Sequence, residues 1–356
     1  MLKNLNFFSG KKVFITGHTG FKGTWLTQIM ILSGSKVAGF SLPSSELNSH
    51  FEGLNLRDKI THYEGDIRDA NALLSAITEF KPDVVFHLAA QALVKLAYAS
   101  PSDTFETNVM GSLHLLQAVQ ACPSIKSLIY VTSDKCYENV EWVWGYKETD
   151  ILGGRDPYSA SKACAELVFS SFTRSFFSDR HDLGFASVRA GNVIGGGDYS
   201  ADRIVPDCIR AIREGRAIEL RNPESTRPWQ HVLEPLSGYI ALAEKLYLHP
   251  EYYSEAWNFG PLGKDVRNVG SVAQTIVNIY GRGSVAKNAI QANFHEANLL
   301  QLNCDLANRK LGWSPRWSVD TTLSMTALWY RSIDEGKAML EITNGQIEEY
   351  FNQKHG

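Results

Sequence analysis

The chain has 356 residues, of which 44% are hydrophobic and 21% charged, and this balance excludes intrinsic disorder as its main character. With 35 Lys and Arg against 38 Asp and Glu, its net charge of −3 argues against a protein built around a basic nucleic-acid footprint. The five cysteines are scattered and form no C-x-x-C pair, so they indicate reduced thiols, with neither a disulfide scaffold nor a metal site expected.

The sequence carries no sign of a targeting or membrane segment. Its first residues include no apolar core of the kind found in a secretory signal. No run approaches the ~18 apolar residues that a membrane span needs. We therefore expect a cytoplasmic protein that works on a small molecule, with no membrane or nucleic-acid partner.

The first two thirds of the chain alternate between short apolar runs and amphipathic stretches. Strands are expected over residues 13–16, 36–40, 61–64, 83–88, 127–132 and 185–189, and helices over 24–33, 70–80, within 102–119, and over 156–177. This alternation predicts an α/β fold, a Rossmann-type doubly wound parallel sheet with helices on both faces. Such a sheet binds its ligands at the carboxyl ends of the strands.

The first expected strand continues directly into a glycine-rich loop, Gly17-His-Thr-Gly20-Phe-Lys-Gly23, and then into a helix. Glycines at this spacing permit a tight turn that brings the backbone close to a pyrophosphate, and the helix N-terminus supplies unpaired N–H groups to the anion. The loop therefore predicts dinucleotide binding. The expected contacts are Gly17, His18, Gly20, Phe21, Lys22 and Gly23.

NAD is the expected dinucleotide, although the acid that usually holds its ribose about 20 residues further on is missing. The second strand ends at Ser41, which is expected to replace that acid. Lys22 either favours an extra phosphate or is solvated, so NADP remains the alternative. Asp66, followed by Ile67, is a candidate acceptor for the adenine amino group, and a loop-capping role is the alternative.

A second motif lies in the helix expected over residues 156–177. Tyr158 and Lys162 are four residues apart and share one face of this helix, for which Asp156 is a suitable N-cap. A lysine one turn from a phenol stabilises the phenolate and lowers its pKa from about 10 toward neutrality. Tyr158 is therefore predicted to be a base that takes a hydroxyl proton, and a surface helix pair is the alternative.

The character of the chain changes after Gly191, where glycine and proline become more frequent and short helical pieces alternate with loops. We expect a boundary near residue 190. Residues 1–190 would form the NAD-binding domain. Residues 191–356 would form mainly a smaller α/β lobe for the substrate, with segments that return to the first domain.

The glycine-rich loop and the Tyr158–Lys162 pair together resemble the extended short-chain dehydrogenase/reductases that act on nucleotide sugars. The resemblance covers nearly the whole chain and includes Val188-Arg-Ala-Gly-Asn192. It implies NAD as the cofactor and a homodimer or homotetramer paired through two long helices. The further cofactor contacts that it implies are Leu88, Ala89, Ala90, Asn108 and Thr132.

The segment Val131-Thr-Ser-Asp-Lys-Cys-Tyr137 follows the fifth expected strand, at the tip that faces the sugar in this family. Its Ser133-Asp134-Lys135 run resembles that of nucleotide-sugar 4,6-dehydratases, which carry a hydroxyl, then Asp, then usually Glu. Together with the glycine-rich loop, it is most similar to the dehydratases that act on CDP-glucose. The resemblance therefore implies CDP-glucose as the substrate and a 4-keto-6-deoxy sugar, used in lipopolysaccharide biosynthesis, as the product.

The resemblance also implies a role for each residue at this tip. Ser133 would hydrogen-bond the 4-oxygen, Asp134 would protonate the departing 6-oxygen, and Lys135 would remove the C5 proton. A lysine base must be neutral, so its pKa would have to fall from about 10.4. The alternatives for Lys135 are a cation that stabilises the enolate and an ion pair with Glu138 or Glu148.

Substrate contacts are expected mainly after residue 190. Arg203 and Arg227 are candidates for the diphosphate because arginine binds such oxygens bidentately, and surface ion pairs are the alternative. His295 and Glu296 stand where many relatives use a further arginine. The expected substrate contacts are Ser133, Asn192, Arg203, Val205, Arg227, His295 and Glu296.

Two other functions remain open on the sequence alone. A sugar-nucleotide 4-epimerase of the same fold generally lacks the acid that Asp134 supplies. A non-catalytic dinucleotide-binding protein would have no need of Ser133, Tyr158 and Lys162 together.

Overall fold

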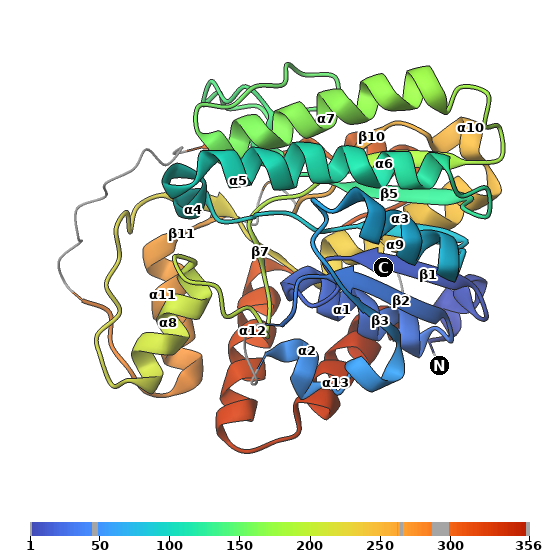
Figure 1. Ribbon diagram of the computed structural model, residues 1–356. Helices are drawn as coiled ribbons and strands as arrows, with labels where there is room; N and C mark the ends of the chain where they lie inside the picture. Colours follow the sequence, from blue (N-terminus) through green and yellow to red (C-terminus); the bar gives the residue numbers. More distant parts are fainter. Residues whose placement is uncertain (1, 45–48, 262, 264–265, 287–298, 354–356) are drawn as a thin grey trace.

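A seven-stranded parallel sheet organises the molecule (Figure 1). The computed structural model describes residues 2–44, 49–261, 263, 266–286 and 299–353. The sheet has the strand order β10-β6-β5-β4-β1-β2-β3, and the Rossmann-type doubly wound fold is confirmed. The strands are β1 (Lys12–Thr16), β2 (Lys36–Ser41), β3 (Thr61–Glu64), β4 (Val84–His87), β5 (Ser127–Val131), β6 (Gly184–Arg189) and β10 (Ala256–Asn258).

Helices cover both faces of this sheet. The helices are α1 (Phe21–Leu32), α2 (His50–Gly53), α3 (Ala70–Phe80), α4 (Val94–Ala99), α5 (Pro101–Phe105), α6 (Ser112–Gln120), α7 (Pro157–Phe176), α8 (Ile204–Arg213), α9 (Leu233–Leu248), α10 (Pro250–Tyr253), α11 (Val269–Tyr280), α12 (Val319–Asp334) and α13 (Met339–Asn352). Shorter helical turns are η1 (Lys3–Phe8), η2 (Arg57–Lys59), η3 (Glu106–Gly111), η4 (Asp134–Cys136) and η5 (Ala307–Leu311). Within the described ranges, no helix combines the length and the apolar character that a membrane crossing requires.

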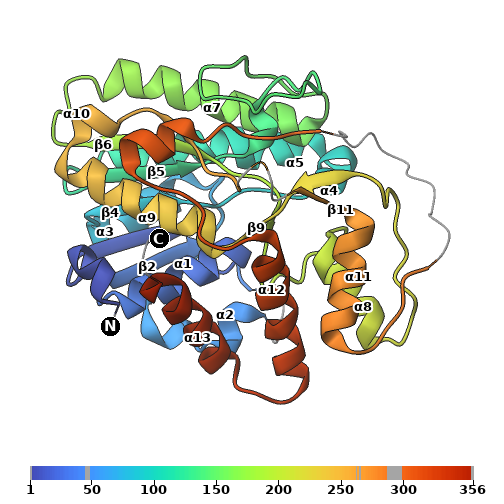
Figure 2. The same ribbon diagram turned by 180° about the vertical axis from the view of Figure 1, so that it is seen from behind.

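The strands are apolar on both sides because both sides are covered. Successive residues of a strand point to opposite faces, so Val13 and Ile15 pack with α1 and α9 while Phe14 packs with α3 and α6. Figure 2 shows α9 in front of the sheet, and Figure 1 shows α6 and α7 over the other face. The two clusters explain why the expected strands read as continuous apolar runs.

The chain after residue 191 contributes to the sheet as well as to a separate lobe. β10 pairs with β6 in parallel, and α9 packs against β5 and β6. The lobe beside the sheet is built on α8 and α11, with two small sheets formed by β7 (Val193–Ile194) with β9 (Gln230–His231), and by β8 (Thr226–Pro228) with β11 (Val266–Asn268) (Figure 1). One hydrophobic core cluster extends from Leu2 to Phe351 and joins both parts.

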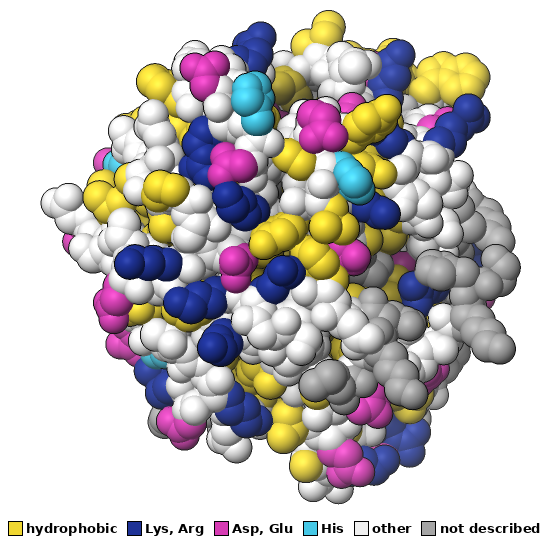
Figure 3. Space-filling model, turned by 90° about the vertical axis from the view of Figure 1, so that its right-hand side faces the viewer, with side chains coloured by type: hydrophobic (Ala, Val, Ile, Leu, Met, Phe, Trp, Pro, Cys, Tyr) yellow, Lys and Arg dark blue, Asp and Glu magenta, His cyan; other side chains and the backbone are white. Residues whose placement is uncertain are grey.

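The surface turned away from the lobe is seen in Figure 3. Basic and acidic side chains are interspersed over the visible part of this face, with small hydrophobic patches between them. This mixture agrees with the nearly balanced charge of the whole sequence.

Four histidines are buried in the protein interior. Burial lowers the pKa of His18, His50, His87 and His231 from 6.5 to about 3. His50, for example, lies edge-on between the rings of Trp25 and Trp329, at centroid distances of 5.3 and 5.2 Å. These imidazoles are therefore neutral in the folded protein at neutral pH.

We expect the protein to lose stability as the pH falls from 6.5 toward 3. In this range the histidines are protonated in the unfolded chain but stay neutral in the folded protein. Above pH 6.5 the contribution is fully present. The slope contributed by each histidine approaches about 1.4 kcal/mol per pH unit. Denaturant midpoints measured across this range test the prediction. His50→Gln should reduce the dependence of the unfolding free energy on pH, whereas His181→Gln, at an exposed position, should leave it unchanged. Equal pH dependence in the wild type and both variants would contradict the prediction.

Candidate active site

A large cavity opens at the carboxyl ends of the strands, between the sheet and the lobe built on α8. Its volume is about 1660 Å³. This exceeds the roughly 300–1,000 Å³ that is usual for a site that takes one small ligand, so the cavity has room for two. Of the residues predicted for cofactor, substrate or catalysis, those that line it are Gly17, Gly20, Phe21, Lys22, Gly23, Ser41, Asp66, Ile67, Leu88, Ala89, Ala90, Thr132, Ser133, Asp134, Lys135, Tyr158, Lys162, Asn192, Arg203, Val205 and Arg227.

The glycine-rich loop joins β1 to α1 at one end of this cavity. Gly17 has a φ of +72°, and a Cβ there would lie 2.7 Å from the backbone nitrogen of Ala89. A Cβ on Gly23 would lie 2.0 Å from the carbonyl oxygen of Gly17. Only glycine fits these positions, and the tight turn aims the N-terminus of α1 at the cavity. The loop is therefore a cradle of the size and polarity that a pyrophosphate requires.

Lys22 leaves this loop toward the catalytic end of the cavity. Burial lowers the pKa of its ammonium to about 8, helped by the positive charges of Arg203 and Lys162 and opposed by Asp134. The charges that act on it are thus the predicted substrate residue Arg203 and the predicted catalytic residues Asp134 and Lys162. The Lys22 side chain is half-buried and not fully solvated, and its preference for an extra phosphate stays a prediction.

Ser41 and Asp66 line the opposite end of the cavity. The Ser41 hydroxyl shares a hydrogen bond of 2.9 Å with the Thr19 hydroxyl. The Asp66 carboxylate accepts hydrogen bonds from the Arg68 side chain, at 2.6 and 2.9 Å, and from the Arg68 backbone N–H at 2.9 Å. The hydrogen bonds from Arg68 hold the pKa of Asp66 below its usual value. Asp66 thus caps its turn and still borders the cavity.

Two side chains predicted to contact the cofactor do not line the cavity. The His18 imidazole is buried away from it, with Nε2 2.7 Å from Nδ1 of His62. The Asn108 amide donates to the Gln91 carbonyl at 3.0 Å and to the Ser161 hydroxyl at 2.9 Å, so it fixes the segment after β4 against α7. Motif spacing locates a residue in the chain but not the direction of its side chain. His295 and Glu296 lie outside the described residues.

The tip of β5 carries the Ser133-Asp134-Lys135 run into η4. The Ser133 hydroxyl donates to Asp134 Oδ1 at 3.0 Å and accepts from the backbone N–H of Lys135 at 3.3 Å. A Cβ on Gly191 would lie 1.8 Å from a carboxylate oxygen of Asp134, so the carboxyl occupies the space that this glycine leaves. The need for glycine at position 191 was not recognised in the sequence, although Gly191 stands directly after β6.

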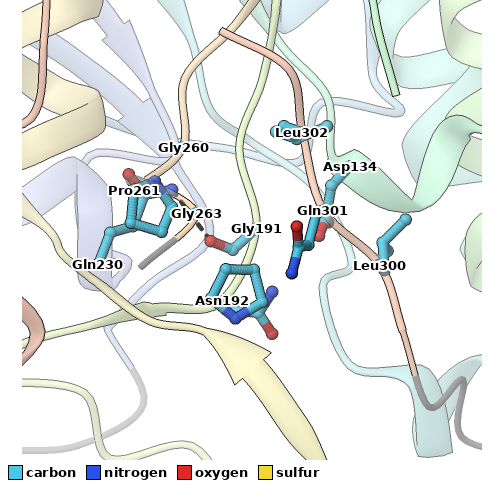
Figure 4. Close-up of a pocket in the computed structure, with 11 residues that line it drawn as sticks. Asp134, Gly191, Asn192, Gln230, Gly260, Pro261, Gly263, Leu300, Gln301 and Leu302 are labelled. Atoms are coloured by element: carbon cyan, nitrogen blue, oxygen red, sulfur yellow. Dashed lines mark hydrogen bonds between the residues drawn. The ribbon is translucent and has the colours of Figure 1, made fainter. Parts of the chain in front are cut away.

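A small side pocket borders Asp134, with Gly191 and Leu302 also in its lining (Figure 4). Its volume of about 20 Å³ is enough for one water molecule. Gln230 bridges its wall by donating to the carbonyls of Gly191 and Phe259, both at 3.0 Å. Asn192, with a φ of +54°, borders both this pocket and the main cavity.

Tyr158 and Lys162 enter the cavity from the first turns of α7. As expected, Asp156 caps this helix by accepting from the Ser159 N–H at 3.0 Å, and Pro157 is its first residue. Both Tyr158 and Lys162 are less than a tenth exposed. The local sequence therefore fixes where these two side chains stand.

The pKa of Tyr158 differs from the expectation. Burial raises it to about 12, with Asp134 adding to the rise and an interaction with the Ser133 hydroxyl opposing it. Burial also lowers the pKa of Lys162 to about 8, opposed by the negative charge of Glu166, which lies one turn further along α7. The prediction that Lys162 lowers the pKa of the phenol was therefore wrong for the protein alone, because desolvation dominates and the positive charge that opposes it is that of Arg203.

Glu166 belongs to a buried network that the sequence analysis missed. Its carboxylate accepts from Arg189 Nε at 2.9 Å, from Arg189 Nη2 at 2.8 Å and from the Ser187 hydroxyl at 2.8 Å, and Thr132 donates to it as well. Arg189 holds the pKa of Glu166 below its usual value. The signal in the sequence was an acid one turn after Lys162 together with an arginine at the end of a strand.

Lys135 is half-buried at the edge of the catalytic end. Its Nζ lies 6.0 Å from the centre of the Tyr158 ring. Within the described residues it makes no ion pair, and the Glu148 carboxylate instead accepts from the Asn258 N–H at 2.9 Å. The alternative of an ion pair with Glu138 or Glu148 is therefore wrong, which leaves the base and the enolate-stabilising cation.

The two arginines predicted to bind the substrate stand on different elements of the lobe. Arg203 directly precedes α8 and forms an ion pair with Asp198 at 2.9 Å. Arg227 lies on β8, where its guanidinium donates to the Thr226 carbonyl at 2.8 Å. Val205, on α8, is buried against the core. All three border the cavity, so the positions agree with a substrate site on the lobe side.

The glycine cradle, the Tyr–Lys helix and the polar tip of β5 on one parallel sheet together define a short-chain dehydrogenase/reductase of the extended type. The chain belongs to the GDP-mannose 4,6-dehydratase family, whose model matches residues 14–326. It is 47% identical over 351 residues to the CDP-glucose 4,6-dehydratase of Salmonella typhimurium, and this alignment covers 98% of both chains. The human GDP-mannose 4,6-dehydratase is 27% identical, over 86% of this chain and 87% of that one.

Solved structures show the same fold at lower identity. The dTDP-glucose 4,6-dehydratase of Bacillus anthracis, in complex with NAD, is 22% identical with a TM-score of 0.76 and covers 92% of this chain and 98% of its own. The UDP-glucose 4-epimerase of Thermotoga maritima, with UDP-glucose, is 24% identical with a TM-score of 0.77 and covers 90% and 99%. At this identity the structures establish the fold and not the reaction.

Proposed function

We propose that this chain is a CDP-glucose 4,6-dehydratase, which converts CDP-glucose to CDP-4-keto-6-deoxyglucose with loss of water across C5 and C6. The observation that carries the proposal is an acid beside the base: Asp134 borders the cavity next to Ser133 and Tyr158. An epimerase has no leaving group to protonate and so has no need of this acid. Identity of 47% along 98% of the Salmonella typhimurium enzyme supports the same reaction and the same nucleotide.

NAD is the proposed cofactor, and the glycine-rich loop supports it because Gly17 and Gly23 permit the tight turn that aims the N-terminus of α1 at the cavity, where a pyrophosphate would bind. The hydroxyl of Ser41 and the carboxylate of Asp66 would hold the ribose and the adenine. When bound, NAD supplies the oxidant that removes hydrogen from C4 and returns it to C6. The rest of the chemistry is proton transfer by the protein.

We assign one residue to each proton transfer. Tyr158 removes the proton of the 4-hydroxyl, whose oxygen is held by Ser133. The resulting 4-ketone acidifies the C5 proton, which Lys135 removes. Asp134 protonates the 6-oxygen, which leaves as water, and Lys135 returns its proton to C5. A well-placed acid or base of this kind contributes about 10²–10⁴-fold to a rate.

The nucleotide would lie on the lobe side of the cavity. Arg203 and Arg227 are proposed to bind the diphosphate, with Asn192 donating to the same group and Val205 supporting the nucleoside. Because Arg203 is already held by Asp198, its guanidinium is oriented before the substrate arrives.

We also propose a cytoplasmic homodimer or homotetramer. The five cysteines are all free thiols, as expected in a reducing compartment. Large apolar side chains are exposed at Met110 on η3 and at Leu167 and Phe176 on α7. They support pairing of two subunits through α6 and α7, which lie side by side in Figure 1.

The test of function is an assay with NAD and four sugar donors in separate reactions. We expect loss of the mass of one water from CDP-glucose and much slower or no loss from dTDP-, UDP- and GDP-glucose. Asp134→Asn serves as the matched control, and it should bind NAD but eliminate water slowly. NAD binding without water loss from any donor would instead favour an epimerase or a non-catalytic binding protein.

A further inference from the structure

Three buried polar side chains follow one another at the catalytic end of the cavity. The Tyr158 phenol, the Ser133 hydroxyl and the Asp134 carboxyl are 8%, 6% and 5% exposed. Ser133 Oγ lies 3.0 Å from Asp134 Oδ1. Tyr158 lines the same end of the cavity as Ser133 and Asp134, and an interaction with the Ser133 hydroxyl opposes the rise in the pKa of Tyr158. One hydroxyl thus connects the base of the oxidation to the acid of the elimination.

The proton balance of the proposed dehydration requires such a connection. In each turnover Tyr158, acting as the base, gains one proton from the 4-hydroxyl, and Asp134 loses one proton to the departing 6-oxygen. Lys135 takes a proton from C5 and returns it to C5, so it is in balance. One proton must therefore pass from Tyr158 to Asp134 before both groups can act again.

We propose that Ser133 relays this proton, so that the proton removed from the 4-hydroxyl leaves in the water molecule. The Tyr158 O–H bond breaks as a new O–H bond forms on Ser133 Oγ, and Ser133 gives its own proton to Asp134 Oδ1. Asp134 then protonates the 6-oxygen as the C6–O bond breaks. Tyr158 is thereby ready to act as the base again, Asp134 returns to carboxylate, and no proton is drawn from solvent. This inference rests on the proposed dehydration.

Burial favours the relay over exchange with bulk solvent, because all three groups are less than a tenth exposed. The competing route is a water molecule in the side pocket beside Asp134, which Asn192 and Gln301 also border (Figure 4). A proton delivered through that pocket would bypass Ser133 altogether. The two routes therefore differ in whether elimination depends on the Ser133 hydroxyl.

The test compares CDP-glucose with its 6-deoxy-6-fluoro analogue. Fluoride leaves as an anion and needs no proton, so the analogue does not require a proton on Asp134. We expect Ser133→Ala to lower kcat/KM at least about tenfold more for CDP-glucose than for the analogue, in line with the usual effect of losing a general acid. Loss of the contact between Ser133 and the 4-oxygen affects both substrates equally and cancels in the ratio.

Two variants accompany this comparison. Asp134→Asn should show the same bias toward the analogue, and Ser133→Thr, which keeps the hydroxyl, should show none. Unfolding midpoints establish that each variant is folded. Equal losses on both substrates in Ser133→Ala, with the bias retained in Asp134→Asn, would overturn the relay in favour of the side pocket. A wild-type protein that releases neither water nor fluoride would overturn the proposed function itself.

Discussion

Replacing Lys135 with methionine is expected to lower turnover of CDP-glucose by about 10²–10⁴-fold, because the C5 proton loses its base. The oxidation at C4 precedes this step and should survive, so reduced cofactor should accumulate in a single turnover. Methionine matches the length of the lysine side chain, and the half-buried site tolerates it. Absorbance of the reduced nicotinamide and the mass of the sugar product measure the two steps separately.

The arginine variant distinguishes the two roles left open for Lys135. Arginine remains a cation and does not act as a base at neutral pH. We expect Lys135→Arg to be as slow as the methionine variant, since we assign the base. If the arginine variant instead stays within about tenfold of the wild type, Lys135 acts as a cation that stabilises the enolate. Lys147→Met, a change at an exposed lysine on the following segment, should leave both steps unaffected.

The second large effect concerns stability and the Glu166–Arg189 ion pair. Both side chains are almost completely buried, and two hydrogen bonds of 2.8 and 2.9 Å join them. Glu166→Ala leaves the guanidinium buried without its partner, so the free energy of unfolding should fall by about 3–5 kcal/mol. That is a large share of the about 5–15 kcal/mol by which proteins are usually stable. Chemical denaturation measures the change.

Two control variants test whether the loss of stability in Glu166→Ala comes from a buried charge left without its partner. Arg331→Ala breaks the exposed pair with Glu335, whose atoms are 2.7 Å apart, and should cost about 1 kcal/mol or less. The double variant with methionine at positions 166 and 189 removes both charges and should recover most of the lost stability. If Glu166→Ala is as mild as the surface change, the buried pair does not carry the stability assigned to it.

The parts of the fold that the sequence predicted well are those with local causes. β1, the glycine-rich loop and α1 follow one another within 21 residues, from Lys12 to Leu32, and a Cβ at Gly17 or Gly23 would strike a backbone atom. The start of α7 was predicted to the residue, because Asp156 and Pro157 determine it through local hydrogen bonding and backbone geometry.

The parts that were missed depend on distant contacts. β10 has only three residues, and its strand exists because Trp257 and its neighbours pair with β6, about 70 residues earlier. The pKa of Tyr158 rises through burial that the whole cavity wall creates, which the spacing to Lys162 does not reveal. His18 lies in the expected loop, but the imidazole ring of His18 contacts His62 and does not line the cavity.

The continuity of the core from Leu2 to Phe351 has a consequence for recombination among relatives. A chimera joined once near residue 190 would take β6 from one parent and β10 and α9 from the other. Its sheet edge would then have to accept foreign partners at Trp257 and along the whole of α9. To exchange nucleotide preference, only the region from β7 through α8, residues 193–213, should be transplanted, because it contributes Arg203 and Val205 to the cavity. This transfer keeps β10 and β6 from the same parent.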